Sequence, residues 1–142
     1  GNTYVTKNQY DKAISDFNSA IEIDPKSADA YFNRGIIFAS GKRDYDTAIS
    51  DISKAIEINP RLVDAYYYRG RIYDAKGKYQ KAVIDYNRAI EINPKFAKAY
   101  AKRGVFYGRI GQTRKFCLDL KRACDLGSCK YYDIAKNTGA CQ

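Results

Sequence analysis

The sequence predicts an all-α fold of the solenoid type, in which pairs of antiparallel helices stack in a row. One unit of 34 or 35 residues recurs four times along the 142 residues, as the spacing of Pro25, Pro60 and Pro94 shows. Within the units, apolar residues follow the three-and-four spacing of a buried helix face. A unit of this length cannot bury its apolar face alone, so it must stack on its neighbours.

Prolines and glycines set the expected helix ends and crossings. The residue before each proline is pushed out of the helical region, so each proline separates two helices. Gly35, Gly70 and Gly104 lie in mid-helix, where glycine costs about 1 kcal/mol against alanine, and a close helix crossing is the expected compensation. We expect helices over residues 10–23, 28–40, 45–58, 62–75, 79–92, 96–109 and 113–125, and a last helix over 128–137.

The best copy of the unit, residues 63–96, carries a pattern of small, aromatic and proline residues: Ala65, Tyr66, Gly70, Tyr73, Gly77, Tyr79, Ala82, Tyr86, Ala89 and Pro94. The sequence therefore resembles the tetratricopeptide repeat family. The resemblance implies a right-handed α-solenoid of antiparallel helix pairs that binds a protein or peptide. It divides a single domain into a truncated repeat (1–27, with Gly1 and Tyr4 in the pattern), repeats 28–62 and 63–96, a divergent repeat (97–128) and a cysteine-containing cap (129–142).

In proteins of this family the first helices of successive repeats line a concave groove, and the matching exposed positions form columns along it. The resemblance places these partner-binding residues there: Asp29, Phe32, Asn33, Ile36, Asp64, Tyr67, Tyr68, Arg71, Asp74, Lys98, Lys102, Val105 and Arg109. The same columns contain Asn2 and Val5 before them, and Ala39, Ala101 and Gly108 among them. Aromatic and apolar members offer contact area, while the cations offer charge-assisted hydrogen bonds to carboxylates. Packing between repeats is the alternative role for each aromatic residue.

The net charge of +9 is unevenly placed: residues 1–93 hold 14 Lys or Arg against 13 Asp or Glu, whereas residues 94–142 hold 11 against 3. A solvated helix face is one interpretation of this basic end. The other is a dock for an acidic protein segment, a polyanion or a nucleic acid. A third alternative for function is self-assembly through exposed repeat ends, above all the truncated N-terminal end near Tyr10 and Phe17.

A recurring charge pair has a structural interpretation. Arginines recur beside the glycines at Arg34, Arg69 and Arg103, and aspartates recur on the second helices at Asp16, Asp51, Asp85 and Asp119. A binding site rarely needs the same pair in every repeat, so we expect a structural ladder.

Four cysteines fall within the last 26 residues. If the helix over 113–125 folds back on the capping helix through a turn at Gly127, the expected pairs are Cys124–Cys129 and Cys117–Cys141. Such bonds would favour a periplasmic or extracellular location. Zinc binding and free thiols are the alternatives, although no Cys-x-x-Cys pair is present.

Catalysis and cofactor binding have no support in the sequence. The chain has no histidine, so it lacks an imidazole base and a Cys-His pair. It has no phosphate-cradling glycine loop and no apolar run long enough to span a membrane. The chain also begins without methionine or a signal peptide, so we expect it to be part of a longer protein.

Overall fold

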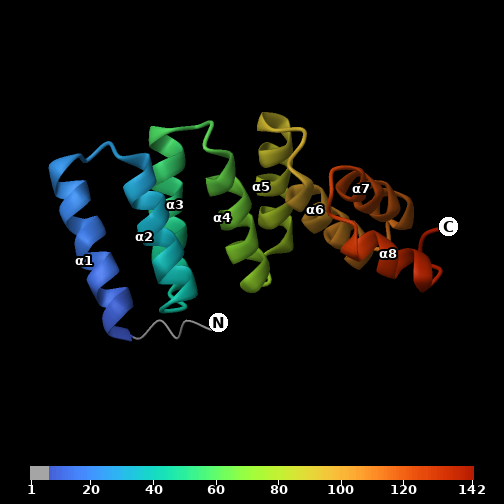
Figure 1. The fold of residues 1–142 in the computed structure, drawn as a ribbon, viewed down its shortest axis with the longest axis horizontal. Coiled ribbons are helices and arrows are strands. Elements are labelled where there is room, and N and C mark those ends of the chain that lie inside the picture. Colours follow the sequence, from blue (N-terminus) through green and yellow to red (C-terminus); the bar gives the residue numbers. More distant parts are fainter. Residues whose placement is uncertain (1–6) are drawn as a thin grey trace. The chain divides into compact units, whose positions relative to one another are not determined.

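The computed structural model describes residues 7–142, and over this range it contains eight helices and no strand (Figure 1). The helices are α1 (Lys7–Ile23), α2 (Ala28–Ser40), α3 (Tyr45–Ile58), α4 (Val63–Ala75), α5 (Tyr79–Ile92), α6 (Ala97–Arg109), α7 (Thr113–Asp125) and α8 (Lys130–Asn137). The predicted all-α class is confirmed. Helix α1 begins three residues earlier than predicted, and helix α8 begins two residues later than predicted. The predicted pattern and groove residues Gly1, Asn2, Tyr4 and Val5 lie outside the described residues.

The chain divides into two compact units, Gly1–Lys76 and Gly77–Gln142. In unit 1, consecutive helices from α1 to α4 pack on one another, and α2 also contacts α4. A core forms from Ala48, Ile52, Ala65 and Ile72. The mid-helix Gly35 allows the close crossing expected from the sequence, because a Cβ there would lie 2.8 Å from Cγ1 of Ile52.

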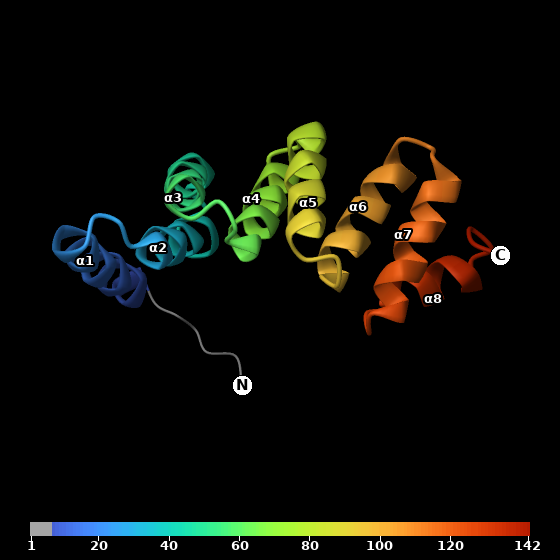
Figure 2. The ribbon, with the colours of Figure 1, turned by 90° about the horizontal axis from the view of Figure 1, so that it is seen from above.

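In unit 2, α6 lies between α5 and α7, and α8 packs on α7 (Figures 1 and 2). Gly104 repeats the crossing of Gly35, since a Cβ there would lie 3.1 Å from Cδ2 of Leu120. After α7 the chain reverses at Gly127, whose φ of 105° lies in the left-handed region that glycine adopts without strain. This turn brings α8 back against α7, as the sequence predicted.

The cysteines of unit 2 form two disulfides, Cys117–Cys141 and Cys124–Cys129. These are the pairs expected from the sequence. Cys141 is buried beside Leu120 and Ala135, so the longer loop closes directly over a small apolar cluster. The bond compensates for the small core of this cap, because it restricts the unfolded chain.

The predicted charge ladder is present in both units. Arg34 donates two hydrogen bonds of 2.7 Å to Asp51 and one of 2.8 Å to the side-chain oxygen of Asn18. In unit 2, Arg103 donates to Asp119 at 2.7 and 2.8 Å and to Asn87 at 3.0 Å. Each arginine therefore ties its own repeat to the second helix of the repeat before it.

These contacts hold the guanidinium groups in their charged form. The hydrogen bonds to Asp51 raise the pKa of Arg34, and those to Asp119 raise the pKa of Arg103. Asp51 and Asp119 are both buried, whereas Asp16, at the equivalent position of α1, is exposed. The ladder expected from the sequence therefore does not extend to Asp16.

Candidate functional site

The candidate partner-binding residues of unit 1 lie on two helix faces. On α2, Phe32 and Ile36 are half-buried, and Asp29 and Asn33 beside them are exposed. Their spacing of three, four and seven residues puts all four on one side of the helix. The predicted residues of α4 follow the same spacing, and α2 and α4 contact each other. The predicted residues of each helix therefore share one side of that helix.

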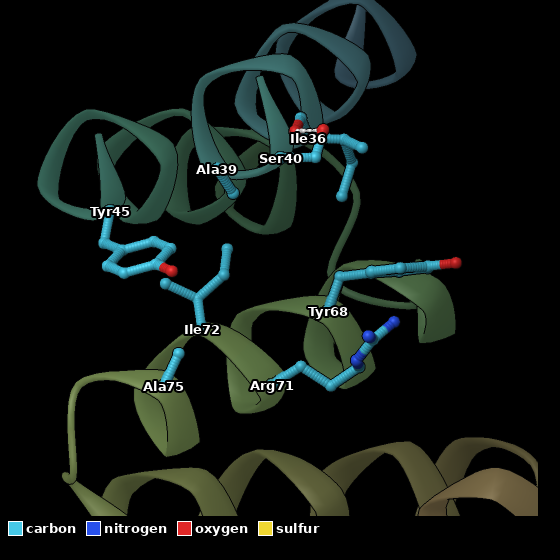
Figure 3. Close-up of a pocket in the computed structure, with 8 residues that line it drawn as sticks. All are labelled: Ile36, Ala39, Ser40, Tyr45, Tyr68, Arg71, Ile72 and Ala75. Atoms are coloured by element: carbon cyan, nitrogen blue, oxygen red, sulfur yellow. Dashed lines mark hydrogen bonds between the residues drawn. The ribbon is translucent and has the colours of Figure 1, made fainter. Parts of the chain in front are cut away.

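A pocket of about 220 Å³ opens between these two helices (Figure 3). Its walls come from α2, from the first residue of α3 and from the C-terminal half of α4, and its lining residues are Ile36, Ala39, Ser40, Tyr45, Tyr68, Arg71, Ile72 and Ala75. The walls are stable because Ile72 is buried in the core, with Ile36, Tyr45 and Tyr68 packed against it. Alanines at positions 39 and 75 leave the space that larger side chains would fill.

Two groups make the pocket chemically distinctive. The guanidinium of Arg71 lies 5.6 Å from the ring centre of Tyr68 and 5.9 Å from that of Tyr67, and within residues 7–142 it has no carboxylate partner. Figure 3 shows the Tyr45 ring extending across the pocket toward Ile72. In the same range the Tyr45 hydroxyl makes no hydrogen bond. An apolar group could enter here, with a free cation beside it for a carboxylate.

Two further aromatic rings lie close to Tyr68, which lines the pocket. Phe32 and Tyr68 meet edge to face with ring centres 5.7 Å apart, and Tyr67 meets Tyr68 at 5.3 Å. Tyr67, however, is only 5% exposed. The sequence expectation that this ring offers accessible contact area is therefore not met, and its neighbour Tyr68 borders the pocket instead.

Several lining residues were not among the predicted site residues, namely Ser40, Tyr45, Ile72 and Ala75. Tyr45 and Ile72 look like ordinary core positions in the repeat pattern. The pair of alanines near the ends of α2 and α4 was the only sequence signal of an opening. Of the predicted residues, the pocket brings together Ile36, Ala39, Tyr68 and Arg71. The others in unit 1 lie outside its lining, namely Asp29, Phe32, Asn33, Asp64, Tyr67 and Asp74.

In unit 2, the predicted residues share one face of α6. Lys98, Lys102, Val105 and Arg109 follow the same helical spacing as their counterparts on α2 and α4. A shallow hollow of about 440 Å³ is lined by Val105, Gly108 and Arg109 of α6, Thr113 and Phe116 of α7, and Ala140. Lys98 and Lys102 make no ion pair with any residue of the described range.

The two units differ in charge. Residues 1–76 contain 11 Lys or Arg and 11 Asp or Glu, whereas residues 77–142 contain 14 and 5. The whole excess of +9 therefore belongs to unit 2. Two of its five carboxylates, Asp85 and Asp119, are buried.

Stacked helix pairs, a structural arginine ladder and a side-chain-sized pocket define a helical-repeat module that binds other proteins. Four models of repeat families match the chain: one described as TPR repeat over residues 1–41, and three described as tetratricopeptide repeat over residues 28–62, 63–96 and 85–115. The chain belongs to the tetratricopeptide repeat family, whose members bind protein partners.

Solved structures of MamA are similar to this chain. One, described as MamA protein, has 30% identical residues and a TM-score of 0.75, and the match covers 83% of this chain and 64% of that one. A MamA double mutant has 19% identity and a TM-score of 0.74, covering 84% and 66%. A third MamA structure, with 23% identity, a TM-score of 0.56 and coverage of 88% and 92%, supports the fold alone. The chain thus spans just under two thirds of the first two. Curated protein sequences gave no match.

None of the helices within residues 7–142 combines the length and the apolar character needed to cross a membrane.

Proposed function

We propose that unit 1 binds a peptide or helix of a partner protein by taking one apolar side chain of that partner into the pocket between α2 and α4. The observation that carries this proposal is the pocket volume of about 220 Å³, with the rings of Tyr45 and Tyr68 in its lining. An engineered protein cavity of about 150 Å³ holds benzene, so this space suits one leucine or phenylalanine side chain rather than a larger ligand.

The charges nearby favour an acidic partner segment. Arg71 lies at the pocket without a carboxylate partner in the described part of the chain, and its fork of donors matches a carboxylate. A segment with one apolar anchor and acidic residues close to it is therefore the proposed ligand class, as part of a scaffold or adaptor role.

A peptide-display selection on the purified protein tests this. We expect enriched peptides to share one Leu, Ile or Phe with an acidic residue within one helical turn. Ala75→Phe should fill the pocket and abolish binding of the enriched peptides, and Phe32→Ala should weaken it by about 1–3 kcal/mol. Tyr67→Ala is a poor probe, because removing a ring that is 5% exposed would disturb packing.

Ser50→Phe is the matched control, since it adds the same bulk at an exposed position of α3 outside the pocket. Binding that survives Ala75→Phe, or that Ser50→Phe reduces equally, would place the site elsewhere.

Two alternative functions can each be tested separately. Polyanion or nucleic-acid binding through the basic repeat is supported by the charge of unit 2, and it would weaken steeply with added salt. Self-assembly through the end near α1 is supported by the absence of any buried residue in that helix. It would appear as concentration-dependent mass in sedimentation.

A further inference from the structure

The outer sides of α5 and α7 carry an unusual pattern of exposed residues. These helices occupy the same register of successive repeats, because their buried residues Asp85 and Ala89 correspond to Asp119 and Ala123 at a spacing of 34. Equivalent exposed residues on the two helices therefore lie on corresponding sides of their helices, away from the buried residues of each.

An aliphatic residue lies at the centre of each outer face. Ile84 on α5 is 64% exposed and Leu118 on α7 is 58% exposed, although both are large and apolar. The equivalent positions of unit 1 are Ser15 and Ser50. Only unit 2 therefore replaces a small polar residue with an exposed aliphatic one at this position.

Every residue three or four positions from Leu118 along α7 is a cation. Its neighbours one turn away in each direction are Arg114, Lys115, Lys121 and Arg122, and all four are exposed. Lys121 pairs with Asp125 at 3.1 Å, whereas the other three have no ion pair within the described range. Arg122 and Lys115 instead lie over the rings of Tyr100 and Tyr107.

The face of α5 continues the pattern more weakly. Lys81 and Arg88 flank Ile84, and Arg88 pairs with Glu91 at 2.9 Å. In unit 1, the residues around Ser50 are Asp46, Thr47, Ser53 and Lys54, which are neutral in sum. The aliphatic centre and the surrounding positive charge thus occur together, and only in unit 2.

We propose that the outer face of α5 and α7, centred on Ile84 and Leu118, binds the surface of a membrane that carries anionic lipids. Exposed aliphatic side chains can enter the boundary between headgroups and acyl chains, while the long cationic side chains around them reach the lipid phosphates. This surface is separate from the pocket of unit 1, so the proposal does not depend on the function proposed above.

The arrangement suits a membrane better than the other anionic partners. Leu118 and Ile84 protrude from helix surfaces, whereas a partner peptide is expected to place its own side chain in a hollow, as in unit 1. Single-stranded nucleic acid would need open aromatic faces for stacking, but cations already lie over the rings of Tyr100 and Tyr107.

Flotation with lipid vesicles tests the proposal. The purified protein should float with vesicles of phosphatidylcholine that contain about 30% phosphatidylglycerol, but not with phosphatidylcholine alone. Binding should fall several-fold between about 0.1 M and about 0.5 M salt, because the headgroup attraction is screened. Leu118→Ser introduces the serine that unit 1 has at the equivalent position, and it should weaken binding about tenfold. Ile84→Ser should weaken binding less.

Matched variants separate specific anchoring from general attraction. Ile23→Ser removes an 86% exposed aliphatic residue outside the patch and should leave binding unchanged. Ser50→Leu adds a leucine without the ring of cations and should not strengthen it. Arg114→Gln with Lys115→Gln should weaken binding at least as much as Leu118→Ser.

Three results would overturn the proposal. The first is failure of the unaltered protein to float with anionic vesicles at low salt. The second is normal flotation of the Leu118→Ser and Ile84→Ser double variant, which would mean that charge alone attracts the protein. The third is tighter binding of an oligothymidylate or a polyglutamate probe than of the vesicles, which would assign the face to nucleic acid or to an acidic protein.

Discussion

Removal of Arg103 should reveal how much the ladder of unit 2 contributes to stability. Arg103→Ala breaks two hydrogen bonds to Asp119, of 2.7 and 2.8 Å, and one of 3.0 Å to Asn87. It also leaves Asp119, which is 7% exposed, as a buried carboxylate without its cation. Loss of one partner from a buried pair costs about 3–5 kcal/mol. The Arg103 side chain is 21% exposed, so water can partly replace it, and we expect about 3 kcal/mol.

Urea unfolding followed by far-ultraviolet circular dichroism measures this free energy, provided that the slope with urea is unchanged. Asp119→Ala should cost a similar amount, and the double variant Arg103→Leu with Asp119→Leu should cost less than Arg103→Ala, because no charge is left buried.

The chain contains its own control in Asp16, which holds the equivalent position of α1 but is exposed. Asp16→Ala should change stability by less than about 0.5 kcal/mol. The reasoning would be refuted if Arg103→Ala cost less than about 1 kcal/mol, or if Asp16→Ala cost as much as Asp119→Ala.

Three further predictions concern the cap, the helix crossings and association. Replacement of Cys117 and Cys141 by serine should lower the free energy of unfolding by about 3.5 kcal/mol, because their bond closes a long loop. Thiol titration under denaturing conditions, on protein from its native compartment, tests whether the bonds form there. Four free thiols would contradict both bonds and, with them, the proposed periplasmic or extracellular location. Gly35→Ala should lower the free energy of unfolding by about 1–3 kcal/mol, since the added Cβ would lie 2.8 Å from Cγ1 of Ile52. Asn33→Ala on the same helix is the control, and thermal unfolding should show almost no change in its stability. At high concentration we expect dimers or end-to-end stacks, and sedimentation that shows only monomer at every concentration would exclude them.

The sequence determined the helices because its signals are local and repeated. Prolines, mid-helix glycines and apolar spacing recur in each unit, so the periodicity that predicts one helix pair also predicts the next. The cysteine pairs could be predicted for a similar reason: Gly127 allows one sharp reversal, and this reversal leaves few partners within reach of each cysteine.

The pocket residues could not be assigned this way. Repetition shows which side of a helix faces inward, but it does not show how much of each side chain the neighbouring helix covers. Tyr67 and Tyr68 are adjacent in sequence and identical in type, yet one is buried and the other borders the pocket. The difference arises from side chains distant in sequence, which come into contact only in the folded chain.

The same distinction applies to charge. The sequence by itself determined that positive charge accumulates toward the C-terminal end and that arginines and aspartates recur in step. The tertiary structure alone decided which of these charges are neutralised: Asp119 is enclosed beside Arg103, Asp16 is left in solvent, and Leu118 remains exposed among four cations. Burial depends on contacts between helices, and such contacts exist only once the repeats have stacked.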